Sequence, residues 1–146
     1  MGATVKEIEI KAPPEKVFSY VADLPKHGEW GKHKVEVTPT SSGPMAVGAT
    51  FDGVGHQMGA HHDKLTITEY SPNTRLAFES NGDAGTVRHV FVVTPSGSGV
   101  KLSKSMEIIK PSFMTRLMTP VIAFMGPSML AQDLERIKER VESSPS

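Results

Sequence analysis

The sequence predicts an α+β domain in which six or seven antiparallel strands form a meander that a long C-terminal helix covers on one face. Three observations predict this architecture. Apolar and polar residues alternate along several short segments, stretches rich in Gly, Pro, Ser and Asn separate these segments, and residues 112–142 have helical spacing instead. Short connections between successive strands make hairpins, so the strands run antiparallel.

A first strand and a helix are predicted within residues 8–30. Ile8 and Ile10 alternate with charged residues, as in a half-buried strand. Pro13 and Pro14 follow, where a helix can begin because a missing N–H costs nothing in its first turn. The apolar residues of this helix recur at helical spacing and form its buried stripe: Val17, Phe18, Val21 and Leu24. Asp23-Leu24-Pro25 closes the helix, and the only tryptophan, Trp30, comes next.

Six further strands are predicted in the middle of the chain. They are Lys34–Pro39, Gly48–Val54, Asp63–Tyr70, Arg75–Ser80, Thr86–Thr94 and Val100–Ile109. In the last of them Val100, Leu102 and Met106 share one face, whereas Lys101 and Ser103 share the other. One face of the sheet is therefore solvated and the other is covered. The only long helical segment that remains to cover it lies at the C-terminus.

The two halves of this C-terminal segment differ in composition. The second half has one apolar stripe, which consists of Leu130, Leu134, Ile137 and Val141. The first half carries Met114, Met118, Met125 and Met129, which share one face of a regular helix. Pro120 or Gly126-Pro127 is expected to kink the segment or to break it into two helices. Flexible methionines suit the wall of an apolar cavity, but a methionine-filled core is an equally open interpretation.

The opening residues 8–30 and the closing segment DLERIKERVE resemble the START-like, birch-pollen-allergen-like (SRPBCC) superfamily, in particular its polyketide cyclase/dehydrase-type members. The resemblance implies a helix-grip fold, in which a curved antiparallel sheet wraps around the long C-terminal helix and two short helices follow the first strand. It also implies a ligand cavity between the sheet and that helix. We expect one ligand-binding domain over residues 1–142 and a disordered tail over residues 143–146.

His89 is the first candidate for chemistry. In the strand Thr86–Thr94 it shares a face with Val87, Phe91 and Val93, so its imidazole is expected to point inward. A hydrogen-bonded core histidine is the alternative. If the inward face lines a ligand cavity, as the resemblance implies, we expect the cavity wall to consist of Tyr20, Trp30, Phe51, Tyr70, Phe78, His89, Phe91, Met114, Met118, Phe124 and Met125.

Composition and motifs exclude several classes of function. Sixteen basic and sixteen acidic side chains leave no net charge, so no nucleic-acid partner is predicted. The chain has no cysteine, and no phosphate loop, nucleophile elbow or dinucleotide unit occurs. His56, His61, His62 and Asp63 cluster, but adjacent residues of a strand point opposite ways, so a solvated hairpin is preferred over a metal site. We expect no cofactor, no transmembrane segment and a cytoplasmic location.

Two functions from different classes remain. One is a carrier or sensor for a small hydrophobic ligand such as a lipid, a fatty acyl chain or a polyketide-like aromatic molecule. The other, which rests on the resemblance, is a polyketide cyclase/dehydratase of the aromatase type in which His89 transfers protons and Tyr20 or Tyr70 assists. A rim of Phe113, Leu117 and Phe124 could touch a bilayer transiently. A protein-interaction role is a weaker third possibility, and the sequence does not indicate the oligomeric state.

Overall fold

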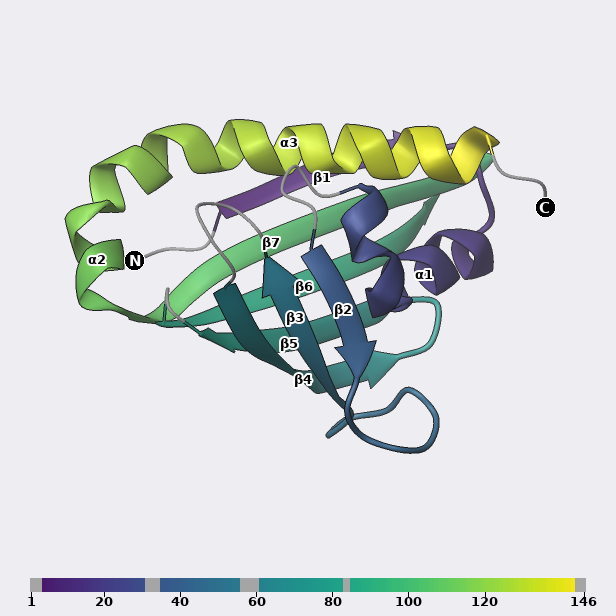
Figure 1. Cartoon of the computed structure of the whole chain (residues 1–146). Helices are drawn as coiled ribbons and strands as arrows, with labels where there is room; N and C mark the ends of the chain where they lie inside the picture. Colours follow the sequence, from purple (N-terminus) through teal and green to yellow (C-terminus); the bar gives the residue numbers. More distant parts are fainter. Residues whose placement is uncertain (1–3, 31–34, 56–60, 83–84, 144–146) are drawn as a thin grey trace.

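The computed structural model describes residues 4–30, 35–55, 61–82 and 85–143. After β1 (Thr4–Ile10) come α1 (Pro14–Ala22) and the short 3₁₀ helix η1 (Leu24–Glu29). The remaining strands are β2 (Val35–Pro39), β3 (Thr50–Gly55), β4 (His61–Ser71), β5 (Arg75–Gly82), β6 (Gly85–Ser96) and β7 (Gly99–Pro111). The chain ends with α2 (Phe113–Leu117) and α3 (Thr119–Ser143), and Figure 1 shows α3 running along the sheet.

The seven strands form one antiparallel sheet in the order β1-β7-β6-β5-β4-β3-β2. Strands β2 to β7 are a meander, and β1 pairs with β7, so that Ile8 lies opposite Leu102. The pairing shifts between Ile67 and Glu69 in β4 and next to Val87 in β6. Such irregularities bend strands, which fits the curvature of the sheet in Figure 1.

The predicted helix-grip fold is confirmed. All seven predicted strands are present, with ends shifted by a few residues, and α1 and η1 are the two short helices after the first strand. The alternation of apolar and polar residues predicted the strands correctly because each strand has one buried and one solvated face. The predicted tail, residues 143–146, lies outside the described residues apart from Ser143, which ends α3.

The core lies between the inner face of the sheet, α1 and the second half of α3. Leu134, Ile137 and Val141 of α3 are at most 1% exposed and belong to the same cluster as Ile10 and Leu102. Three members of the predicted stripe, Val17, Phe18 and Val21, are buried on α1, and the fourth, Leu24, is buried at the start of η1. The second half of α3 is therefore fixed to the sheet by apolar burial, as its sequence pattern predicts.

The C-terminal segment breaks into two helices next to Pro120. Helix α2 has Ser112 as its N-cap, which accepts a hydrogen bond from the Thr115 backbone N–H at 3.2 Å, and Met118 as its C-cap. Helix α3 begins at Thr119, so Pro120 occupies its first turn, where proline is tolerated. Helix α3 continues through Pro127, so the break lies at the first of the two predicted positions.

Candidate functional site

A group of polar side chains lies inside the fold, between the sheet, η1 and α3. We call His27, His89, Lys104, Asp133 and Arg136 the inner polar cluster. They come from η1, β6, β7 and α3, so only the folded chain brings them together. Two aromatic rings contact the cluster, because Trp30 and Phe91 each lie close to both His27 and Lys104.

Lys104 is the buried cation of the inner polar cluster. It lies on the inner face of β7 between Leu102 and Met106, opposite Phe91 of β6, and is 4% exposed. Its ammonium nitrogen is 4.6 Å from the centre of the Trp30 ring and 5.3 Å from that of Phe91. Burial lowers the pKa of Lys104 to about 8, although the nearby Asp133 carboxylate acts in the opposite direction.

Asp133 of α3 is shared by two cations. Its Oδ1 accepts a hydrogen bond from Arg136 Nη2 at 2.7 Å, whereas its Oδ2 lies 3.8 Å from Lys104 Nζ. The second distance is longer than an N–H···O hydrogen bond. Arg136 also donates from Nε to the carbonyl oxygen of Trp30, which ties the helix to the end of η1.

His27 is held as a neutral imidazole. Its Nε2 donates to the carbonyl oxygen of Val21 at 2.8 Å, and its ring centre lies 4.7 Å from that of Trp30 and 5.8 Å from that of Phe78. Burial lowers the pKa of His27 to about 4, and Lys104 adds to the effect. The histidine is therefore uncharged at neutral pH.

His89 points inward, as its position in the strand predicts. Its ring stacks on Phe78 with 4.7 Å between centres and 13° between planes, and its Nε2 is 3.4 Å from Ser80 Oγ. Burial, together with Lys104 and His27, lowers the pKa of His89 to about 3. Its Nδ1 is buried and has no hydrogen-bond partner among the described residues, and the same is true of Trp30 Nε1.

The inner face of the sheet is closed at one end and partly accessible at the other. Phe91, Val93 and Leu102 are at most 4% exposed. Further along the same face, four side chains keep intermediate exposure: Val87, His89, Met106 and Ile108. Figure 1 shows that α2 and the first half of α3 lie at this end of β7. An inward-facing surface is therefore reachable beneath the first half of α3.

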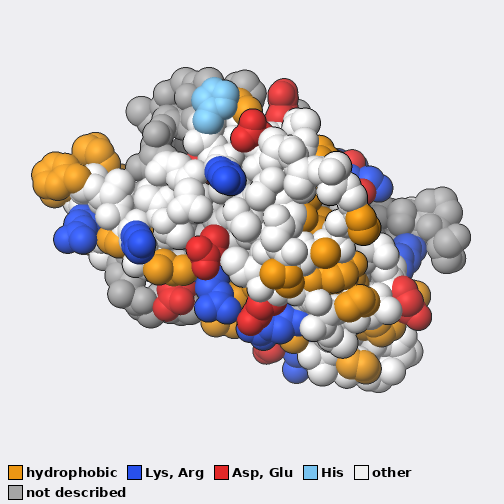
Figure 2. Space-filling view, turned by 90° about the horizontal axis from the view of Figure 1, so that it is seen from below, with side chains coloured by type: hydrophobic (Ala, Val, Ile, Leu, Met, Phe, Trp, Pro, Cys, Tyr) orange, Lys and Arg blue, Asp and Glu red, His pale blue; other side chains and the backbone are white. Residues whose placement is uncertain are grey.

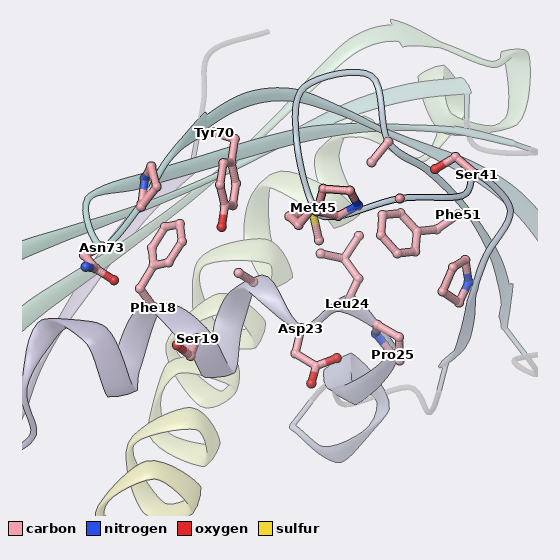
Figure 3. Close-up of a pocket in the computed structure, with 16 residues that line it drawn as sticks. Phe18, Ser19, Asp23, Leu24, Pro25, Ser41, Met45, Phe51, Tyr70 and Asn73 are labelled. Atoms are coloured by element: carbon pink, nitrogen blue, oxygen red, sulfur yellow. The ribbon is translucent and has the colours of Figure 1, made fainter.

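A separate pocket of about 460 Å³ lies at α1 and η1, next to the connection between β2 and β3. Figure 3 shows Phe18 beside Tyr70, and Leu24 of η1 facing Met45 and Phe51. The rim adds polar groups, which include Ser19, Asp23, Ser41 and Asn73. None of the inner polar cluster lines this pocket.

The structure divides the predicted wall residues into four sets. Trp30, Phe78, His89 and Phe91 meet around the inner polar cluster, whereas Phe51 and Tyr70 line the pocket at α1. The Tyr20 hydroxyl donates to Glu29 Oε1 at 3.0 Å, and burial with this contact raises its pKa. The last group is exposed and consists of Met114, Met118, Phe124 and Met125.

The exposure of these methionines contradicts both interpretations, a methionine-filled core and a cavity wall between the sheet and the helix. Met114, Met118 and Met125 are 64%, 45% and 44% exposed. They share an outward-facing surface with Phe113, Leu117, Val121 and Phe124, and we call these seven residues the α2–α3 apolar surface. Figure 2, in which the α2 end lies on the left, shows hydrophobic side chains projecting at that end beside Lys or Arg.

Sequence reasoning missed four members of the inner polar cluster. Lys104 stands on the apolar face of the last strand, between Leu102 and Met106, and this break in the alternation was a usable signal. Asp133 and Arg136 follow the polar pattern of a solvated helix face, and nothing local distinguishes His27. Of the predicted histidine cluster, His56 lies outside the described residues, and His61 and His62 begin β4.

No helix among the described residues is both long and apolar enough to cross a membrane. The helical segment that is richest in exposed apolar residues, α2 with the first half of α3, includes Arg116. No acidic residue occurs between Glu107 and Asp133. The α2–α3 apolar surface is therefore flanked by positive charge alone within this stretch of the sequence.

Residues 1–142 match the family described as polyketide cyclase/dehydrase and lipid transport. None of the curated proteins matches the chain.

Several solved structures share the fold. TTHA0849 from Thermus thermophilus is 21% identical with a TM-score of 0.78, and the alignment covers 99% of this chain and 100% of that one. Protein CV1439 from Chromobacterium violaceum is 17% identical with a TM-score of 0.74 and the same coverage. DynU16, from the dynemicin biosynthetic locus, is 15% identical with a TM-score of 0.68, over 97% of this chain and 47% of that one. At such identities the likeness shows the fold alone.

Proposed function

The chain belongs to the polyketide cyclase/dehydrase and lipid transport family, and on that premise we propose that it binds a small hydrophobic ligand between the sheet and α3. The protein acts as a cytoplasmic carrier or sensor, with residues 1–142 as one ligand-binding domain. The ligand is a lipid, a fatty acyl chain or a polyketide-like aromatic molecule. The family supports a ligand-binding or a cyclase-like role. We choose between these roles from the residues on the inner face of the sheet.

The partly accessible inner face is the observation that carries the proposal. Val87, Met106 and Ile108 point inward, yet they keep intermediate exposure under the first half of α3. A core that is closed by packing leaves such side chains almost fully buried. These apolar residues therefore supply a wall for an apolar ligand, and His89 marks the boundary with the inner polar cluster.

A cyclase role is the second candidate, and His89 is the observation that favours it. Its neutral imidazole has an unpartnered Nδ1 and lies next to the accessible wall, so it is able to accept a proton from a bound ketone. Its low pKa makes it a weak base, which favours the binding role over catalysis. Tyr20 and Tyr70 give no support to catalysis, because one is engaged by Glu29 and the other lines the separate pocket.

A carrier must also collect and release its ligand, and we propose that the α2–α3 apolar surface contacts an anionic bilayer for this purpose. It lies on the same helices that cover the accessible inner face. Lys110 and Arg116 flank it, and acidic residues are absent from this stretch of sequence. Exposed apolar side chains with flanking cations are typical of an interfacial membrane contact.

The test is uptake of a fluorescent apolar probe by purified protein, combined with extraction of any molecule that copurifies. Met106→Trp fills the inner wall, whereas Ser105→Trp adds the same bulk on the outer face of the same strand. We expect Met106→Trp to weaken probe binding about tenfold or more, which corresponds to about 1.4 kcal/mol, and Ser105→Trp to leave it unchanged. A wild-type protein that takes up no probe and carries no ligand would contradict the proposal.

Catalysis is tested separately with a model poly-ketone chain. If His89 acts as the proton-transfer group, His89→Gln lowers the turnover about a hundredfold or more, since general acid–base catalysis contributes about that factor. An unchanged rate removes His89 from any mechanism. An absence of turnover in the wild type, together with tight ligand binding, favours the carrier or sensor.

A further inference from the structure

We propose that the ligand is an apolar acid whose carboxylate binds at Lys104 and the indole N–H of Trp30. The inference rests on the proposed binding function and adds the chemistry of the ligand's polar end. Three features of the inner polar cluster carry it: an unbalanced buried charge, buried polar atoms without partners, and aromatic walls around the cation.

The first feature is the charge balance. Lys104 and Arg136 are two cations that share the single carboxylate of Asp133. His27 and His89 add no charge at neutral pH, because burial keeps both imidazoles neutral. Asp133 makes its close hydrogen bond to Arg136 at 2.7 Å and lies 3.8 Å from the Lys104 ammonium. One positive charge is therefore left over in the cluster. The Arg136 side chain is 34% exposed and partly solvated, whereas Lys104 is buried and is held more loosely by Asp133.

The second feature is the presence of unpartnered polar atoms around this charge. Trp30 is 4% exposed, and its Nε1 has no hydrogen-bond acceptor among the described residues. The ammonium nitrogen of Lys104 lies 4.6 Å from the centre of the Trp30 ring. A buried donor without an acceptor is costly to the fold, so it marks a place where an acceptor is missing. His89 Nδ1 is likewise unpartnered and becomes a third donor in the tautomer that carries its hydrogen there.

The charge and the donors together decide which acceptor fits. A neutral oxygen, as in an alcohol or an ester, satisfies the donors but leaves the buried positive charge in place. A doubly charged phosphate overcompensates it. A carboxylate carries one negative charge and accepts several hydrogen bonds, so it matches both the charge and the donors. The third feature is the pair of aromatic walls. The rings of Trp30 and Phe91 keep water from Lys104, and this strengthens the attraction between the ammonium group and a carboxylate.

The experiment compares dodecanoate with dodecanol, which has the same chain length without the charge, by calorimetric titration at pH 7. We expect the wild type to bind the acid about tenfold or more tightly than the alcohol. Lys104→Met should abolish this preference while the alcohol still binds, and Lys104→Arg should retain much of it. Lys101→Met removes a lysine from the outer face of the same strand and should leave the preference unchanged. Trp30→Phe, which removes the indole N–H together with part of the ring, should reduce the affinity for the acid several-fold and more than the affinity for the alcohol.

Each outcome bears on a stated claim. Equal binding of acid and alcohol by the wild type overturns the carboxylate inference and leaves the proposed binding function intact. Failure of both to bind overturns both. A preference that survives in Lys104→Met also overturns the inference, and if that variant does not fold, the wild-type preference and Trp30→Phe decide the question.

Discussion

At the scale of single residues, Lys104 places a charge where the fold needs none. The strands on both sides of it contribute apolar side chains to the same core, and its ion pair with Asp133 is long. Burying a charge carries a desolvation cost that a loose ion pair does not repay. A residue of this kind lowers stability, so we infer that it is kept for binding.

This gives a prediction for Lys104→Met. Methionine has a similar length, fills the same space and leaves Asp133 paired with Arg136, so we expect the free energy of unfolding to rise by about 1–3 kcal/mol. Urea denaturation at pH 7 measures it, with Lys101→Met as the control that stays within about 0.5 kcal/mol of the wild type. A variant that is less stable than the wild type by about 1 kcal/mol or more would show instead that the ion pair stabilises the fold.

The same residue shows where prediction from sequence stops. Its inward direction follows from alternation along the strand, as does that of His89, which was predicted. Its partners do not follow, because Asp133 is on a helix and His27 on η1, far away in the sequence. Local patterns thus indicate which way a side chain points, whereas the residues that it meets depend on how separate elements pack.

At the scale of elements, α3 has two halves with different roles. Leu130, Leu134, Ile137 and Val141 bury the second half, and transfer of these side chains from water contributes about 6–12 kcal/mol as an upper bound. The first half and α2 expose their apolar residues instead. The sequence predicted the first stripe correctly because a single buried face is unambiguous. It could not decide for the methionines, because a core, a cavity wall and an exposed surface all use apolar side chains at helical spacing.

The α2–α3 apolar surface leads to a prediction about membranes. Phe113, Leu117 and Phe124 are 73%, 61% and 86% exposed, so replacing all three by Ser removes apolar contact area with little effect on packing. We expect the triple variant to lose most of its binding to vesicles that contain anionic lipid and to unfold at about the same urea concentration as the wild type. Cosedimentation with vesicles measures the loss, and high salt should weaken wild-type binding.

The control for this experiment is Val47→Ser. Val47 is 63% exposed and lies on the connection between β2 and β3, so it tests an apolar side chain outside the proposed surface. Unchanged vesicle binding by the triple Ser variant would show that the surface serves another partner. Concentration-dependent self-association of the wild type that the same variant abolishes would identify a second copy of the chain as that partner.

At the scale of the whole molecule, the order of the strands was the feature least determined by local pattern. Successive strands form hairpins from β2 to β7, and turn-rich segments predict these. The pairing of β1 with β7 joins the first and the last strand, and only the resemblance to a known fold implied the wrapped sheet. That pairing places β1 beside the strand that carries Lys104, so the surroundings of the site depend on a contact between segments far apart in the sequence.

The inner polar cluster also predicts how the stability of the whole fold changes with pH. Desolvation inside the fold lowers the pKa values of His27 and His89 to about 4 and 3, below the value of about 6.5 in the unfolded chain. The unfolded state therefore binds more protons below pH 6.5. The stability that comes from keeping both histidines neutral is complete above this pH and is lost progressively as the pH falls towards 4. Lys104, Asp133 and Arg136 are the charged groups that face these rings, and Lys104 adds to the lowering of both pKa values.

We expect the free energy of unfolding to fall between pH 7 and pH 5 by about 1–2 kcal/mol for each of the two histidines, as measured by urea denaturation. His89→Gln removes one titrating group from the cluster and should reduce this fall in the free energy of unfolding by about half. His62 is an exposed residue of β4, so His62→Gln should leave the fall unchanged. The measurement is restricted to pH 5 and above. Hydrogen bonds and cationic partners lower the pKa values of Glu69 and Glu142, so protonation of these carboxylates destabilises the fold at lower pH. A flat profile from pH 7 to pH 5 would mean that both imidazoles are charged or solvated in the native protein.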